Sequence, residues 1–161
     1  MILVRPVAQA DMRAMADLLN EIMRAEDPGS GSAEISRHSL DRWVSSDPAR
    51  SAWHMAEDTA GVLLGFQVIG PKDGLPPDAC EIASFVRIGW ASLPVGSRLF
   101  EITAIAARRL GYTWINASIQ SDNIAALAYY QSRGFESSRV DGDVALAKNP
   151  RGTKISKRYA L

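Results

Sequence analysis

A glycine-containing loop that opens into a helix is the first segment of this sequence whose residues could bind a ligand. It reads "FVRIGWASLPVGSRLF" and places Gly96, Ser97 and Arg98 at the start of a predicted helix. Backbone N–H groups at a helix start, together with the positive end of the helix dipole, bind phosphate oxygens. Ser97 can add a hydroxyl donor and Arg98 a positive charge. The loop therefore predicts an anion site, although Pro94 and Gly96 are also common residues at an ordinary helix start.

A second helix carries two adjacent tyrosines that could serve the core or the chemistry. The stretch "NIAALAYYQSRGF" starts at Asn123, a good capping residue, and stops at Gly134, which can adopt the left-handed conformation that ends helices. Ala126 and Tyr130 are four residues apart and share a face, where the small Ala126 leaves room for a ligand. Aromatic pairs on a helix are usually core residues, so the helix alone leaves the roles of Tyr129 and Tyr130 open.

These two segments require a sheet to position them, and the hydrophobic patterns predict one. The order is β-α-α-β-β-β-α-β-α-β-β, a mixed sheet with helices packed on it in one domain, residues 1–161. The long third helix is expected to end at Gly111 and to bury Leu99, Ile102, Ile105, Ala106 and Leu110. Strands are predicted at 1–7, 51–58, 61–70, 79–88, 112–119, 135–140 and 153–161, and helices at 12–22, 33–46, 96–110 and 123–133.

Composition limits the functions that this chain can have. With 161 residues and 47% hydrophobic residues it can build a sizeable core. Lys and Arg total 18, as do Asp and Glu, so no overall charge recruits nucleic acid or an anionic membrane. Charges at Arg5 and Asp11 interrupt the N-terminal apolar run, and no segment approaches the roughly 20 apolar residues of a membrane span. We therefore expect a cytoplasmic protein with neither nucleic-acid nor membrane partners.

Cys80 is the single cysteine, which excludes an intrachain disulfide within this sequence and fits a reducing compartment. At the start of a buried strand, with no visible His or Asp partner, it is expected to be inert rather than nucleophilic. No GxxxxGK[ST] or GxGxxG pattern is present, so neither a P-loop nucleotidase nor a dinucleotide-binding fold is predicted. The sequence also gives no reason to expect a metal site.

The two segments together resemble the GNAT superfamily of acyl-CoA-dependent N-acetyltransferases. The family's helix pattern of Asn, Ala, Tyr and Gly-Phe matches Asn123, Ala126, Tyr130, Gly134 and Phe135 at the family's spacing. The family's pyrophosphate loop, Gln/Arg-x-x-Gly-x-Gly/Ala, ends ten residues after a strand valine, and ten residues lead from Val86 to Gly96. Within that loop the letters differ, because Ala91 stands at the Gln/Arg position and Pro94 at the first glycine. Pro94 lacks an N–H donor, for which Arg87 or Arg98 could compensate.

The resemblance implies a fold, a cofactor and a set of site residues. The implied fold is α/β (α+β), with a mixed, mostly antiparallel sheet of six to seven strands flanked by about four helices. The implied cofactor is acetyl-CoA as acyl donor, and a homodimer is common among such proteins. The implied cofactor-binding residues are Phe85, Val86, Arg87, Ser92, Leu93, Val95, Gly96, Ser97, Arg98, Asn123, Ala126 and Tyr130.

The resemblance also implies a mechanism, which is direct attack of an amine on acetyl-CoA in a ternary complex. Tyr130 is then the acid that protonates the departing thiolate, since a phenol with a pKa near 10 is protonated at neutral pH. Glu81 is the candidate base, and His54, without a placed partner, is the weaker one. A backbone N–H near Val86 or Arg87 would hold the oxyanion.

The acceptor is the part that the sequence determines least. A primary amine of a small molecule or amino-acid-like substrate is favoured, because an α-amino group loses its proton at neutral pH far more easily than a lysine amine does. The changes at Ala91 and Pro94 keep two alternatives open. One is a non-catalytic acyl-CoA-binding or regulatory module on the same fold, and the other is a partner-binding domain that has lost the cofactor.

Overall fold

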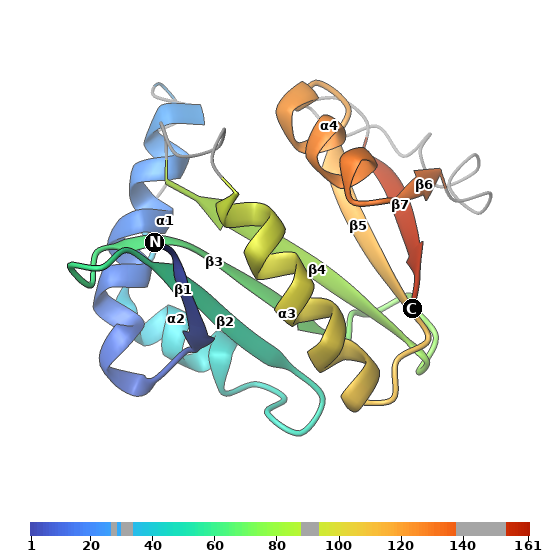
Figure 1. Ribbon diagram of the computed structural model, residues 1–161, viewed down its shortest axis with the longest axis horizontal. Coiled ribbons are helices and arrows are strands. Elements are labelled where there is room, and N and C mark those ends of the chain that lie inside the picture. The colour runs from blue at the N-terminus through green and yellow to red at the C-terminus, as the bar shows by residue number, and fades with distance from the viewer. Residues whose placement is uncertain (27–28, 30–33, 88–93, 138–153) are drawn as a thin grey trace.

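A mixed sheet with helices on both faces organises the chain (Figure 1). The computed structural model describes residues 1–26, 29, 34–87, 94–137 and 154–161. Within these residues the sheet has seven strands in the order β1-β2-β3-β4-β5-β7-β6. The strands are β1 Leu3–Pro6, β2 Ala52–Glu57, β3 Leu63–Gly70, β4 Ala79–Val86, β5 Trp114–Gln120, β6 Glu136–Ser137 and β7 Lys154–Ala160. The helices are the short 3-10 turn Gln9–Asp11, then α1 Met12–Glu26, α2 Arg37–Val44, α3 Val95–Arg109 and α4 Ile124–Ser132.

The sheet opens between its two central strands. Every pairing among the described strands is antiparallel except β4 with β5, which is parallel. That parallel ladder runs only from Ala79 opposite Trp114 to Glu81 opposite Asn116. Figure 1 shows β4 and β5 starting together near the C-terminus and then diverging. The second half of β4 therefore has a neighbouring strand on its β3 side alone.

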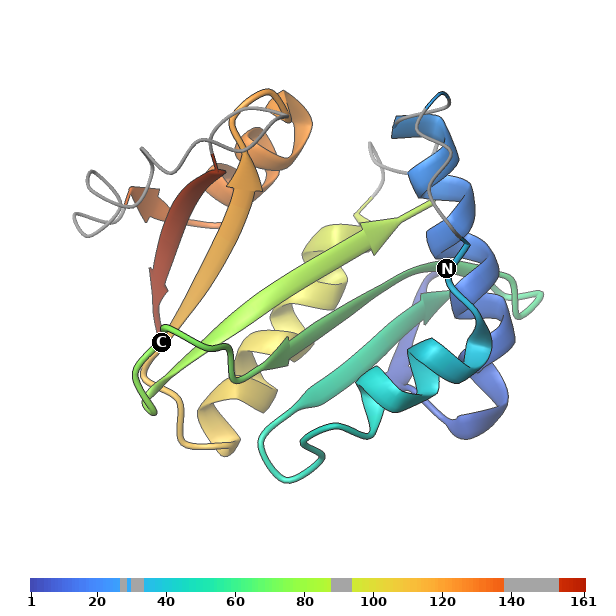
Figure 2. The same cartoon turned by 180° about the vertical axis from the view of Figure 1, so that it is seen from behind.

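The helices divide between the two faces of the sheet. Figures 1 and 2 show α3 and α4 on one face and α1 and α2 on the other. The core of the first face joins α3 and α4 to β4 and β5, and includes Ile82, Phe100, Ala104, Ile115 and Tyr130. The core of the second face joins α1 and α2 to β2 and β3 through Met15, Leu18, Leu40, Trp53 and Phe66.

The buried side of α3 differs from the predicted one. Leu99 is fully buried as expected, but Ile102 and Ile105 are 37% and 43% exposed, and Leu110 is also exposed. The side chains that face the sheet are Val95, Leu99, Phe100, Thr103, Ala104 and Ala107. The prediction was wrong because it followed the large aliphatic residues, whereas the small Ala104 and Ala107 are the ones packed into the core.

The predicted ends of α3 and α4 are confirmed, whereas α1 continues to Glu26 and α2 is limited to Arg37–Val44. The Asn123 side chain accepts a hydrogen bond from the Ala126 N–H at 3.1 Å, which caps α4. Gly111 and Gly134 have φ angles of 91° and 102°, so both adopt the left-handed conformation that terminates a helix. Among the described residues, no helix combines the length and apolar character needed to cross a membrane.

Candidate active site

A groove of about 1100 Å³ lies where β4 and β5 diverge. Its walls come from the second half of β4, the end of β5, the first turn of α3, one face of α4 and the apolar side of α1. Seven of the predicted cofactor-binding residues line it, namely Phe85, Val86, Gly96, Ser97, Asn123, Ala126 and Tyr130. Ser92 and Leu93 lie outside the described residues. The divergence of the strands thus brings these seven residues, which are separated by up to 45 positions in the sequence, around one space.

The first turn of α3 presents backbone N–H donors at one end of this groove. Arg98 N–H donates to Pro94 O at 3.0 Å, and this is the first hydrogen bond of the helix. The N–H groups of Val95, Gly96 and Ser97 precede it and have no acceptor within the helix. Pro94 takes the N-cap position, where its missing N–H removes no helical bond. Among the residues that the structure describes, these three N–H groups therefore have no helical acceptor, despite the proline.

Gly96 is required by a neighbouring tyrosine. A Cβ atom at this position would lie 2.7 Å from Cε1 of Tyr129, and the Tyr129 hydroxyl donates to Gly96 O at 2.8 Å. The space beside the Gly96 Cα is therefore occupied by the α4 ring. The absence of a side chain at Gly96 therefore makes room for Tyr129.

Two predicted cationic ligands have other partners. Arg87 donates to Glu21 Oε2 and to Leu63 O, both at 2.9 Å. Arg98 donates to Ile2 O at 3.2 Å. Neither of them lines the groove, and the Val95 side chain is fully buried in the core. These three predicted cofactor-binding side chains therefore do not face the groove. Arg87 and Arg98 bind oxygen atoms on other elements, and Val95 packs in the core.

Beyond Glu81, no described strand pairs with the edge of β4 that faces the gap. Arg87 N–H donates to Leu64 O on β3 at 2.8 Å. Successive residues of a strand turn their N–H and C=O groups to opposite edges, so Ser84 and Val86 turn theirs toward the gap. The Arg87 N–H is therefore unavailable for the predicted oxyanion contact, and the Val86 N–H is the one that faces the groove.

Tyr130 is buried at the gap and hydrogen-bonded to β4. Its side chain is 6% exposed, and its hydroxyl lies 2.8 Å from Ser84 Oγ. Burial raises the pKa of Tyr130 above that of a free phenol, while the hydrogen bond with Ser84 lowers it. The phenol is thus protonated throughout the physiological pH range and can act as a proton donor.

Glu81 closes the fork between β4 and β5. It occupies the last paired position of the ladder, and its carboxylate accepts from Asn116 Nδ2 at 2.7 Å, Ser118 N–H at 3.1 Å and Ser118 Oγ at 3.3 Å. Lys72 Nζ lies 3.7 Å from the same carboxylate. The side chain therefore replaces the ladder bond that β5 loses at the divergence, and this structural role accompanies any catalytic one.

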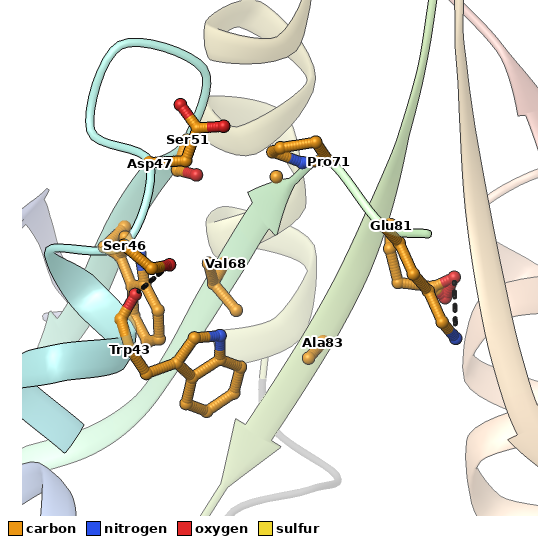
Figure 3. A pocket seen from close by; sticks show the side chains of 11 residues that line it. Trp43, Ser46, Asp47, Ser51, Val68, Pro71, Glu81 and Ala83 are labelled. Carbon is orange, nitrogen blue, oxygen red and sulfur yellow. Dashed lines mark hydrogen bonds and ion pairs between the residues drawn. The ribbon is translucent and has the colours of Figure 1, made fainter. Parts of the chain in front are cut away.

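A recess of about 340 Å³ opens beside β4 on the face covered by α1 and α2. Figure 3 shows Trp43 on one side of it and Glu81 on the other. Lys72, which forms an ion pair with Glu81, also lines the recess. Trp43 is 42% exposed and packs edge-on against Trp53 with 4.7 Å between ring centroids. Trp43 and Ala83 line both the recess and the groove, so the two spaces adjoin.

His54 lies on β2, opposite Gln67 of β3. Burial lowers the pKa of His54, so its imidazole is neutral at pH 7. It lines neither the groove nor the recess. The structure therefore keeps His54 away from the place where a substrate amine would be deprotonated.

Cys80 is buried, as its position in the sequence predicted, with Sγ 3.9 Å from Trp114 O. Burial, followed by the Glu81 charge, raises the pKa of the Cys80 thiol to about 12. At pH 8 the thiolate fraction is then about one in ten thousand, against about a quarter for an unfolded cysteine. We expect an aromatic disulfide reagent to modify the native protein at least about 1000-fold more slowly than the protein unfolded in urea. Rapid modification of the folded protein would contradict this burial, and Cys80→Ala supplies the background rate.

Three groove residues, Ser84, Arg133 and Lys154, and the buried Gln67 behind them escaped the sequence reasoning. Gln67 and Ser84 contact the two tyrosines from neighbouring strands, and Arg133 and Lys154 bring positive charge to the groove. Polar residues inside the apolar runs "LLGFQVIG" and "IASFV" were the available signal for Gln67 and Ser84, because a buried strand seldom carries them without a partner. No local pattern pointed to Arg133 or Lys154, since their placement depends on how α4 and β7 pack.

Known structures with the same fold span nearly the whole chain. A GCN5-related N-acetyltransferase from Kribbella flavida is 22% identical, with a TM-score of 0.77 over 99% of this chain and 98% of the other. The ribosomal-protein-alanine N-acetyltransferase of Brucella melitensis is 18% identical, with a TM-score of 0.80 over 99% of both chains. A Salmonella typhimurium protein assigned as an acetyltransferase, solved with its cofactor acetyl-CoA, is 17% identical, with a TM-score of 0.79 over 99% of this chain and 94% of the other.

At these identities the likeness concerns the fold, and no curated protein matches the sequence significantly. The family assignment comes from the sequence itself. The model of the acetyltransferase (GNAT) family matches residues 12–135, well over half of the chain, and this range contains the groove walls from α1 to α4. The chain therefore belongs to the GNAT family of acetyltransferases.

Proposed function

We propose that this protein transfers an acetyl group from acetyl-CoA to a primary amine of a small molecule or amino-acid-like substrate. The observation that carries the proposal is the groove itself. A buried phenol, the edge of β4 that β5 leaves and the first turn of a helix all line one space. Acyl transfer from a thioester uses these three features as acid, positioning edge and anion site.

The residues present fit acetyl-CoA. The N–H groups of Val95, Gly96 and Ser97 would bind the pyrophosphate, and Arg133 and Lys154 would offset its remaining charge. The open edge of β4 at Ser84 and Val86 would hydrogen-bond the pantetheine amides, as an added strand would. When bound, the cofactor supplies an activated thioester carbonyl.

The chain's own residues then carry the proton transfers. The acceptor amine attacks the thioester carbonyl directly, forming the C–N bond, while the Val86 N–H holds the oxyanion. As the C–S bond breaks, Tyr130 gives its phenolic proton to the thiolate. Glu81 is proposed to receive the proton that the substrate ammonium loses before attack, with that ammonium displacing Lys72 from its 3.7 Å contact. The second proton, which the nitrogen loses as the amide forms, would restore the Tyr130 phenol by way of solvent.

The recess beside β4 is proposed to hold the remainder of the acceptor. Trp43, Trp53, Val68 and Ala83 give it an apolar wall, and Ser46, Asp47, Ser51 and Lys72 give it polar groups. Its position beside Ala83 lets an amine reach the gap from the face opposite Tyr130. This arrangement supports a compact acceptor that has an apolar part and a polar end.

Release of free CoA thiol tests the proposal. Acetyl-CoA is incubated with the protein and a panel of α-amino acids, their amides, aryl amines and alkyl diamines, and thiol release is compared with samples lacking the amine. We expect acetyl-CoA to bind with micromolar affinity and at least one α-amino acceptor to give catalytic turnover. Micromolar binding without thiol release across the panel would instead favour a regulatory module. No binding at millimolar acetyl-CoA would defeat both.

Trp43→Ala is expected to weaken binding of the acceptor but not binding of acetyl-CoA. Losing the exposed indole removes an apolar wall of the recess, which corresponds to about a tenfold increase in acceptor KM. The KM for acetyl-CoA should change less than about twofold, because the helix start and the β4 edge are untouched. Val62→Ala, which trims another exposed apolar residue, is the control. An unchanged acceptor KM would place the acceptor elsewhere.

A further inference from the structure

A continuous hydrogen-bond chain links the start of α3 to Tyr130. The Tyr129 hydroxyl lies 2.8 Å from Gly96 O, and Gln67 Nε2 lies 3.2 Å from the same hydroxyl. Gln67 Nε2 also lies 2.7 Å from Ser84 Oγ, which in turn lies 2.8 Å from the Tyr130 hydroxyl. Gln67 is fully buried, so its amide makes these contacts away from water.

The backbone carbonyl at one end of this chain fixes its direction. A carbonyl oxygen can only accept, so the Tyr129 hydroxyl must donate to Gly96 O. The Tyr129 oxygen is then left to accept, and only the NH₂ side of the Gln67 amide can donate to it. The same NH₂ group faces Ser84 Oγ, which therefore also accepts.

This direction determines where the Tyr130 proton points. Ser84 accepts from Gln67 and still has its own proton, which it can donate to the Tyr130 oxygen. Tyr130 then has no need to donate to Ser84, and its phenolic proton stays available to the groove. The same donation stabilises the phenolate that remains after proton transfer.

We infer that Tyr129 and Gln67 are positioning residues that orient Ser84 as a donor and so keep the Tyr130 proton directed at the leaving thiolate. This inference rests on the function proposed above for Tyr130. Tyr129 and Gln67 act through Ser84 and have no step of their own in the acetyl transfer.

The other side of the Gln67 amide explains why Tyr129 matters. Gln67 Oε1 is buried and has no hydrogen-bond partner among the described residues. The Ser84 hydroxyl can either donate or accept, so it does not fix which way the amide points. Among the described residues, only the hydrogen bond to Tyr129 fixes the orientation of the amide. If the amide turned over, Oε1 would accept from Ser84, and Ser84 would then accept the Tyr130 proton. The start of α3, where the cofactor anion is proposed to bind, is thus connected to Tyr130 by the hydrogen bonds that begin at Gly96 O.

Kinetics of Gln67→Leu and Tyr129→Phe, each in the wild-type and the Tyr130→Phe backgrounds, test the inference. In the wild-type background we expect kcat to fall about three- to tenfold, the size of one hydrogen bond, with the KM for acetyl-CoA nearly unchanged. In the Tyr130→Phe background the same changes should have less than a twofold effect, because the proton that they position is gone. Equal losses in both backgrounds would show a general structural role and overturn the inference.

A spectroscopic measurement makes the test independent of turnover. With ¹³C-labelled tyrosine, the Tyr130 Cζ resonance should shift in both variants, since its hydroxyl changes from accepting to donating. Tyr112→Phe is the matched control, because it removes a buried hydroxyl that donates to Arg50 O at 2.6 Å and takes no part in the hydrogen bonds between Gly96 and Tyr130. It should leave both the Tyr130 resonance and kcat unchanged.

The outcomes separate the two levels of the proposal. An unmoved Tyr130 resonance in both variants overturns the hydrogen-bond direction, whatever the activity. A shifted resonance, with kcat unaffected by Tyr130→Phe, keeps the direction and defeats the proposed acid. Tyr129→Phe retains its ring against Gly96, so it remains informative even if Gln67→Leu fails to fold.

Discussion

Tyr130→Phe lowers kcat for acetyl transfer by about 100-fold, the lower part of the range for loss of a general acid. The variant keeps the ring that packs against Tyr129 and Phe135, with centroids 4.9 Å and 5.1 Å away, so the core and the groove wall are preserved. Acetyl-CoA affinity should stay within about twofold of wild type. Steady-state thiol release and calorimetric titration measure the two quantities.

The pH dependence gives a second view of the same group. A general acid loses activity as pH rises through its pKa, and burial raises the pKa of Tyr130 above 10. We therefore expect kcat in the wild type to show no falling limb between pH 7 and about pH 10 from this residue. A kcat that is unchanged in Tyr130→Phe would remove Tyr130 from the acid role. Tyr112→Phe, which lies outside the groove, shows the effect of losing a buried hydroxyl as such.

Gly96→Trp should weaken acetyl-CoA binding by at least about 100-fold. Even a Cβ at this position comes within 2.7 Å of the Tyr129 ring, so the larger side chain must displace that ring and enter the end of the groove. The change also breaks the contact of Tyr129 with Gly96 O and disturbs the first-turn N–H groups. Overpacking of this kind also costs about 1–3 kcal/mol of folding stability.

The control for this variant is Ile105→Trp on the same helix. Ile105 is 43% exposed and lies more than two turns beyond the groove, so this variant adds the same side chain without entering the site. Calorimetric titration with acetyl-CoA, together with thermal unfolding, compares the two variants. Wild-type affinity in a folded Gly96→Trp protein would mean that the cofactor does not use the start of α3.

The element order, the hairpin of β2 and β3 and the ends of α3 and α4 could be predicted because they depend on local features. Asn123 caps α4 through its own side chain, and Gly134 ends it through its own backbone freedom. The helix pattern from Asn123 to Phe135 pointed to Tyr130 through its resemblance to the GNAT family, and Tyr130 does line the groove.

The local sequence could not predict which candidate site residues on different elements lie next to one another in the fold. The divergence of β4 from β5 opens the groove. No residue pattern within either strand predicts this divergence, because strand pairing depends on both segments together. Arg87 and Arg98 have the right charge and spacing for a phosphate, yet Glu21 and Ile2, brought close by the fold, bind them instead.

The sequence by itself determined the element order, through hydrophobic periodicity and capping residues, and the family, through the resemblance of one helix motif and one loop spacing. The residue proposed as the acid follows from that resemblance. Only the tertiary structure decided that Gly96 makes room for Tyr129, that Glu81 closes a fork and that Gln67 orders the hydrogen bonds leading to Tyr130. The physical reason is that hydrogen-bond direction and steric exclusion are set between strands and helices far apart in the chain, and a linear pattern carries no such distances.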